Sequence, residues 1–292
     1  MDSIQNQSFS LVKLSKDVQR RIRFLATPKQ AYKLQVAVGN EENHLGPTQF
    51  GLANPWFPHH SFVRENEKLV LKEFALTPYG VINQVVRMEK DTLIVINHEF
   101  DPSIMVETDV TDPIFDHIIL EPYSINLENG FFTAKMLQKI ATKSCRILKF
   151  NGHFLSYGVD LLTVLQSFPC CQKIKIGNLR YENWAQTFIE AGIVDMLNLW
   201  LYGDPGYIYS CTPLEVYMLC RAQQNDFKLE LNVFTKTDVY FTVFHQSIGD
   251  FFVETNENDE DIVLTVVQVQ FKVYYKFKVD EMDSDDTGEE DE

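Results

Sequence analysis

The stretch 145–179, CRILKFNGHFLSYGVDLLTVLQSFPCCQKIKIGNL, decides how the second half of the chain folds. Its two ends, 145–150 and 172–179, are short apolar runs of the kind that form buried strands. Between them, 158–168 has apolar residues at helical spacing and stops at Pro169, which cannot continue a helix. The stretch therefore predicts a strand, a helix and a second strand, and a connection of this kind favours parallel strands.

The same alternation continues on both sides of this stretch. The other strand-like runs are 117–123, 196–203 and 227–234, and the other helix-like runs are 131–142, 181–192 and 213–223. The expected strand centres are separated by 28, 26, 25 and 30 residues: Leu120, Leu148, Ile174, Leu199 and Leu229. This spacing is close to that of leucine-rich repeats, roughly 20–29 residues. We therefore expect an α/β solenoid that is a degenerate relative of these repeats, with a doubly wound sheet as the alternative.

Three further strand-like segments follow the repeats. They are 238–244, 250–255 and 261–279, and we expect them to form a β-rich cap over the open edge of the repeat sheet. Residues 280–292 hold nine acidic residues and no basic ones, which is typical of a disordered acidic tail. The repeat-like domain is thus predicted to span 113–279, with the tail at 280–292.

The part before the repeats is predicted to contain a linker and a small β unit, at 46–112. The linker is rich in proline and aromatic residues and has no periodicity. After it, the β-branched runs 68–76, 80–88 and 91–100 are separated by short turns, which favours antiparallel pairing.

Two short helices are predicted at the amino end, within 1–45. Val18, Ile22 and Leu25 recur at helical spacing in the first. The second has a strong start signal, because Thr27 is a candidate N-cap, Pro28 fits the first helical position and Gln30 completes a capping box.

Composition excludes several functional classes. The net charge is −15, or −6 without the nine acids of the tail, and it argues against nucleic-acid binding, which needs a basic surface. The longest apolar run, 262–271, is too short to span a membrane, and the first residues hold no apolar signal core. Five cysteines without paired spacing predict reduced, buried thiols, so we expect a cytoplasmic or nuclear protein.

Catalytic, metal-binding and cofactor motifs are weak or missing. The sequence holds no nucleophile elbow, phosphate-binding loop, dinucleotide fingerprint or zinc-protease motif. The pairs His59-His60 and His98-Glu99 are weak candidates, since ordinary polar residues are common at strand ends. We therefore predict no catalytic residue, metal ligand or cofactor and a non-enzymatic protein, while an enzyme of unfamiliar class stays a minor alternative.

Residues 9–37, FSLVKLSKDVQRRIRFLATPKQAYKLQVA, resemble an F-box. The matching residues are Phe9, Leu11, Leu14, Asp17, Val18, Ile22, Leu25, Pro28 and Leu34. The chain departs from the family at Ser10 and Ser15, where prolines are usual, and at Arg23, where an apolar residue is usual. The region 114–279 is similar, in its rhythm of strands and helices, to the nematode-expanded F-box-associated families, in particular the FTH type.

The resemblance implies a substrate-recognition subunit of an SCF-type ubiquitin ligase. The helices would bind a Skp-type adaptor, and through it the cullin ligase complex, by seven apolar residues: Phe9, Leu11, Leu14, Val18, Ile22, Leu25 and Leu34. The carboxyl-terminal domain would hold a protein substrate, for which Tyr202, Tyr207 and Tyr209 are the candidate contact residues. The alternative is a repeat scaffold that binds a protein partner independently of any ligase.

Overall fold

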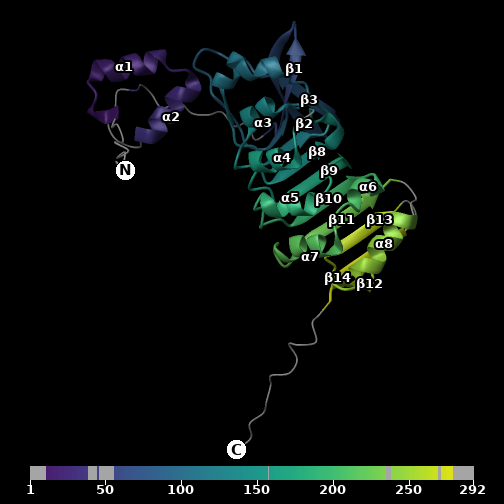
Figure 1. Ribbon diagram of the computed structural model, residues 1–292. Coiled ribbons are helices and arrows are strands. Elements are labelled where there is room, and N and C mark those ends of the chain that lie inside the picture. The colour runs from purple at the N-terminus through teal and green to yellow at the C-terminus, as the bar shows by residue number, and fades with distance from the viewer. Residues whose placement is uncertain are drawn as a thin grey trace, which may run out of the picture. The chain divides into compact units, whose positions relative to one another are not determined.

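The computed structural model describes residues 11–38, 45, 56–156, 158–234, 238–268 and 271–278. The chain divides into two compact units, Met1–Pro122 and Tyr123–Glu292. The described residues form a mixed α/β structure with eight α-helices and mostly parallel strands (Figure 1). None of the helices in these ranges has the length and apolar character needed to cross a lipid bilayer. The predicted acidic tail, 280–292, lies outside the described residues.

The second unit is built on an open sheet whose first strands follow one another in chain order. These strands are β7 (Ser124–Leu127), β8 (Ile147–Asn151), β9 (Lys173–Leu179), β10 (Asn198–Gly203) and β11 (Lys228–Val233), all parallel. Leu148 is the register partner of Ile174, Ile174 of Leu199, and Leu199 of Leu229. Four of the five predicted strand centres therefore lie in one row across the sheet.

The fifth predicted centre, Leu120, is wrong. Leu120 ends β6 (Ile118–Leu120), which pairs with β4 (Ile94–Ile96) in a separate two-stranded sheet of the first unit. The strand that pairs with β8 is β7, and Ile125 is the partner of Leu148. The apolar residues of 117–123 predict one continuous strand, but Pro122 interrupts it because proline cannot donate a ladder hydrogen bond.

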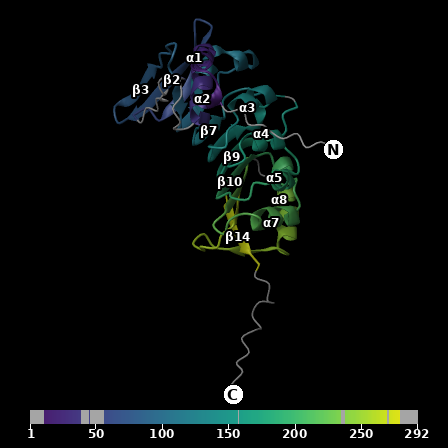
Figure 2. The same ribbon diagram turned by 90° about the vertical axis from the view of Figure 1, so that its left-hand side faces the viewer.

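Helices cover one face of this sheet. They are α3 (Ala134–Ile140), α4 (Leu161–Ser167), α5 (Trp184–Glu190) and α7 (Pro213–Arg221), with the single-turn α6 (Pro205–Ile208) after β10. Figure 1 shows α3, α4, α5 and α7 along one side of β8 to β11, and Figure 2 shows the same four helices on one side of β9 and β10. The side chains of β8 to β11 that face the helices are buried, and the alternate ones on the other face are only half-buried. The single helical layer differs from a doubly wound sheet, which has helices on both faces.

The end of the sheet is partly as predicted. β13 (Leu264–Gln268) pairs in parallel with β11, and β14 (Phe271–Phe277) and β12 (Phe252–Thr255) continue the sheet antiparallel. The predicted strand 238–244 is wrong, because it belongs to helix α8 (Asp238–Ile248). Its β-branched and aromatic residues favour strand formation, but Phe244 and Ile248, one helical turn apart, are both buried. Tertiary packing has overridden local propensity here.

The first unit contains two of the three predicted antiparallel strands, β2 (Lys68–Thr77) and β3 (Gly80–Val85), which pair with each other. β1 (His59–Glu65), which was not predicted from the sequence, pairs antiparallel with β2. The run 91–100 is not a third antiparallel strand: it is divided between β4 and β5 (Glu99–Asp101), and β5 pairs in parallel with β1. Three short 3-10 helices, η1 (Leu11–Lys13), η2 (Glu107–Thr111) and η3 (Pro113–Asp116), also belong to this unit.

Helices α1 (Lys16–Leu25) and α2 (Pro28–Val38) confirm the two predicted helices. The predicted capping box is present, since Thr27 N donates to Gln30 Oε1 at 3.0 Å and Gln30 N donates to Thr27 Oγ1 at 3.3 Å. The buried residues of α2 are Pro28, Ala31 and Gln35, which lie on one helical face, and α2 contacts η3. The first unit therefore covers one face of α2.

Candidate functional site

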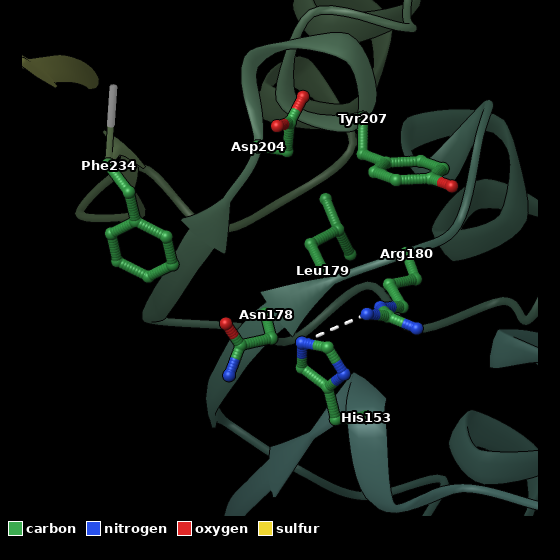
Figure 3. A pocket seen from close by; sticks show the side chains of 7 residues that line it. All are labelled: His153, Asn178, Leu179, Arg180, Asp204, Tyr207 and Phe234. Atoms are coloured by element: carbon green, nitrogen blue, oxygen red, sulfur yellow. Dashed lines mark hydrogen bonds between the residues drawn. The ribbon is translucent and has the colours of Figure 1, made fainter. Parts of the chain in front are cut away.

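A pocket lies where the carboxyl ends of four parallel strands meet at one edge of the sheet (Figure 3). Its volume is about 490 Å³, and seven residues line it: His153, Asn178, Leu179, Arg180, Asp204, Tyr207 and Phe234. They come from the segments that end or follow β8, β9, β10 and β11, His153 being part of the short 3-10 helix η4 (Gly152–Phe154). Ligands of open α/β sheets bind at this edge, so the position itself favours a binding role.

The floor of the pocket depends on the close approach of two strand ends. Asn151 Oδ1 accepts hydrogen bonds from His153 N at 3.0 Å and from Asn178 Nδ2 at 3.1 Å. Asn178 has a φ of 47°, a conformation that asparagine tolerates better than most residues. A Cβ on Gly152 would lie 2.5 Å from Asn178 O, so only glycine fits at this position.

The polar groups of the pocket are fixed by hydrogen bonds. Arg180 Nη2 lies 3.1 Å from His153 Nε2. Because a guanidinium can only donate, His153 Nε2 is the acceptor in this contact. Asp204 Oδ1 accepts from Gly206 N at 2.9 Å and caps α6. The pocket thus presents a guanidinium and a carboxylate that are both held in place.

Two aromatic rings complete the wall. In Figure 3 Tyr207 and Phe234 flank Leu179 from opposite sides, with Asp204 above and His153 below. Among the seven lining residues there is no serine, cysteine or lysine that would act as a nucleophile. Aromatic rings beside groups of both charges are features of surfaces that bind peptides.

Only one of the three predicted substrate-contact tyrosines lines the pocket. Tyr207 does so. Tyr202 lies on the open face of the sheet, with Lys175 Nζ 5.7 Å from the centre of its ring. The ring of Tyr209 packs 5.0 Å from that of Phe244, and its hydroxyl accepts a hydrogen bond from Gln268 Nε2. Tyr209 therefore attaches α8 to the sheet, and burial raises the pKa of its hydroxyl.

The remaining pocket residues were not predicted from the sequence. In the structure β8 to β11 end at Asn151, Leu179, Gly203 and Val233, and one or two residues after each end stand His153, Arg180, Asp204 and Phe234. In parallel strands of consecutive order, such positions meet at the same edge of the sheet. The positions of these residues just after the strands could have indicated the pocket. They do so only when the last residue of each strand is assigned correctly.

The open face of the same sheet presents a row of long side chains. Lys149, Lys175, Trp200 and Glu230 are successive register partners on β8 to β11, and all are half-buried. Lys175 Nζ is 2.8 Å from Glu128 Oε1, which limits its movement. Polar and aromatic side chains therefore continue from one strand to the next over this face.

The predicted adaptor-binding residues are not enclosed by the described part of the chain. Phe9 lies outside the described residues. Leu11, Leu14, Ile22 and Leu34 are half-buried, Val18 is exposed, and Leu25 is 70% exposed. Phe24, which the prediction did not include, is 77% exposed beside Leu25.

A second pocket, of about 530 Å³, lies where α1 ends and α2 begins. Phe24 and Leu25 line it together with Lys90 and Asp91 of the β unit. Lys90 Nζ lies 5.4 Å from the centre of the Phe24 ring, and Arg23 Nη2 lies 3.8 Å from Asp91 Oδ1. Arg23, which replaces an apolar residue of the F-box pattern, thus faces a carboxylate of the same unit.

The weak histidine candidates come together in the first unit. His59 Nδ1 is 2.8 Å from Glu99 Oε2 on β5. His60 is buried, and its Nε2 is 3.6 Å from Glu73 Oε1 on β2. Burial lowers the pKa of His60, with Glu73 opposing the effect and His98 and His59 adding to it. A neutral ring held among strands, away from either pocket, indicates a structural role.

The cysteines confirm the prediction of free thiols. Cys145, Cys171, Cys211 and Cys220 are buried, and Cys170 is half-buried. Cys171 Sγ lies 3.6 Å from Cys145 Sγ without a bond between them, and this contact together with burial raises the pKa of Cys171. Burial also raises the pKa of Cys211 to about 12. Thiols that stay protonated at neutral pH are poor nucleophiles.

No protein-family model, no curated protein and no solved structure matches this chain.

Proposed function

We propose that this protein is a non-catalytic substrate receptor of a cullin-based ubiquitin ligase. In this proposal α1 and α2 bind a Skp-type adaptor, and the second unit binds a protein substrate. The observation that supports it most is the exposure of the α1 residues that an F-box would use, Val18 and Leu25, together with Phe24. Several exposed apolar side chains on one small helical unit favour a protein-binding site.

The charge of the two helices also supports the proposal. Residues 16–38 contain six basic residues, Lys16, Arg20, Arg21, Arg23, Lys29 and Lys33, and a single acid, Asp17. The resemblance implies an acidic adaptor, and opposite charges around an apolar patch raise the association rate more than the final affinity.

For the second unit we propose a degenerate leucine-rich-repeat solenoid. Each strand pairs with the next in chain order, and the row Leu148, Ile174, Leu199 and Leu229 repeats one buried position in four successive units. In such a stack every unit adds one position to the same surface. The strand-end pocket and the open face would then contact an extended stretch of the substrate, with Tyr207 and Trp200 as aromatic anchors.

The test is co-purification of the full chain with a recombinant Skp-type adaptor. Val18→Asp and Leu25→Asp each place a carboxylate in the proposed adaptor-binding face of α1, called the docking face below. We expect the amount of co-purified adaptor to fall at least about tenfold, because burying an unpaired charge is costly. The matched control is Val239→Asp, at an exposed residue of α8. Adaptor recovery that is the same in all three variants and the parent would refute this docking face.

A ligase-independent repeat scaffold is the second candidate. The burial of Pro28, Ala31 and Gln35 against the rest of the first unit favours it, because α2 is then partly a structural element. This function predicts that the unmodified chain recovers no adaptor at all. Substitutions at half-buried Leu14 and Ile22 distinguish the two candidate functions further. If the protein is a scaffold, Leu14→Asp and Ile22→Asp lower only its stability. If it is a ligase receptor, they also abolish adaptor binding.

A further inference from the structure

The outer edge of β3 is a surface that the proposed function does not use. β3 is the last strand of its sheet, and no described strand pairs with its outer side. All six of its residues are exposed, with Val81 at 57% and Ile82 at 53%. In Figure 2 this strand is the outermost one of the β unit. An exposed edge of this kind offers unpaired backbone groups to another strand.

The hairpin formed by β2 and β3 lacks the features that normally protect such an edge from pairing with another strand. Residues 74–86, FALTPYGVINQVV, contain no charged residue, and within β3 there is no proline. By contrast β12, the terminal strand of the second unit's sheet, has only four residues and includes exposed Glu254. Charge and short length are the usual protection against edge pairing, and only β12 has them.

The backbone alternation identifies the free groups on β3. Val86 N donates to Leu71 O at 2.9 Å, just beyond the strand pair Lys72–Val85. Since alternate residues of an antiparallel ladder bond to the partner strand, Gln84, Ile82 and Gly80 face β2. The N–H and C=O groups of Val81, Asn83 and Val85 therefore point away from it.

We propose that β3 pairs with β3 of a second copy of this chain. The three outward residues fix the register, because a twofold axis at Asn83 places Val81 opposite Val85 of the other copy and Asn83 opposite itself. Each of these pairs exchanges two backbone hydrogen bonds. The cross-strand neighbours are then two valine pairs and an asparagine pair, which are favourable or neutral combinations.

Charge favours a copy of this chain as the occupant. At net charge −15, copies of this chain repel one another on average. At β3 two copies can meet without bringing charges together, since self-pairing of an uncharged strand places no like charges opposite one another. The exposed apolar pair Leu76 and Val81, with Tyr79 at the turn, would add side-chain contacts along the joined sheet.

The dimer is expected to be reversible. Two six-residue strands bury less surface than a permanent interface, which typically covers about 1,200–2,000 Å². The expected species is therefore a dimer that dissociates on dilution.

Sedimentation equilibrium of the purified full chain tests this proposal. The expected result is a mass that rises with concentration from 33.9 kDa to twice that value. Asn83→Lys places two ammonium groups at the twofold axis, and Val81→Pro removes an outward N–H without touching the ladder to β2. Each substitution is expected to weaken the dimer at least about tenfold.

Asn258→Lys is the matched control, because it makes the same change in charge at an exposed turn of the second unit. It should leave the dimer unchanged. A monomer at every concentration overturns the proposal, and so does a dimer that survives both Asn83→Lys and Val81→Pro. In either case β3 pairs with a different protein or with none.

Discussion

The imidazole of His60 lies in the interior of the first unit, with 3.6 Å between its Nε2 and Oε1 of Glu73. The two residues are register partners on β1 and β2, and neither ring nitrogen of His60 has a hydrogen-bond partner within the described residues. Glu73 also accepts a hydrogen bond from Gln84 Nε2 at 3.0 Å. Burial lowers the pKa of His60 below its ordinary 6.5, so the folded chain holds this ring neutral at pH 7.

This relationship predicts a loss of stability on the acid side of neutrality. As pH falls through 6.5 the unfolded chain binds a proton on His60, whereas the folded chain does so only at lower pH. Stability is therefore fully present above about pH 6.5 and decreases below it, by about 1.4 kcal/mol for each unit of pKa difference. The urea midpoint, measured between pH 7.5 and 5.5, should fall less steeply for His60→Leu than for the parent chain.

The control for this prediction is His153→Gln, since the His153 side chain is exposed. It should keep the steeper dependence of the parent. Equal slopes for His60→Leu and the parent would mean that the folded and unfolded chains bind the His60 proton at the same pH, contrary to the burial of the ring.

The buried row of the repeat sheet predicts a large effect at Leu199. Its side chain is fully enclosed, and it is the register partner of both Ile174 and Leu229. Leu199→Ala removes these contacts and leaves a cavity, so we expect a loss of about 2–5 kcal/mol in unfolding free energy by urea denaturation. Leu214→Ala on the exposed side of α7 is the comparison and should change it by less than about 0.5 kcal/mol. Similar losses at the two positions would contradict the assigned core.

The cap of α7 gives a further prediction. Thr212 Oγ1 accepts from Glu215 N at 3.3 Å, and Glu215 Oε2 accepts from Thr212 N at 2.6 Å. Thr212→Ala removes half of this box and should cost about 1 kcal/mol, while Thr212→Ser keeps the hydroxyl and should cost much less. Amide hydrogen exchange of the first turn of α7 measures the difference directly. Equal exchange in the two variants would mean that the box does not stabilise the helix.

The parts of the fold that could be predicted from the sequence are those fixed by local chemistry. The capping box at Thr27 depends on neighbours within a few residues, and the strand centres Leu148, Ile174, Leu199 and Leu229 depend on a regular period. They were predicted correctly because helix caps and buried strands have strong sequence signals.

The errors arose where distant contacts decide the structure. α8 has strand-forming residues, but Phe244 packs against Tyr209 far earlier in the chain, and that burial favours the helix. Leu120 was assigned to the repeats because nothing local shows that β6 pairs with β4. Of the candidate site, only Tyr207 was predicted, since the pocket is assembled from four strand ends whose approach is a property of the whole sheet.

The last prediction concerns Gly152, whose lack of a side chain lets the turn after β8 approach Asn178 at the pocket. Gly152→Ala would place a Cβ 2.5 Å from the backbone oxygen of Asn178, and a backbone atom cannot move aside as the end of a side chain can. We expect a loss of about 1–3 kcal/mol in unfolding free energy by urea denaturation, together with a changed imidazole resonance of His153, since the ring is held on Arg180 by the same turn. Gly249→Ala is the control, because a Cβ at Gly249 meets no atom within 4 Å. If Gly152→Ala is as stable as Gly249→Ala, the ends of β8 and β9 do not approach as described, and the pocket between them is wider than the one in Figure 3.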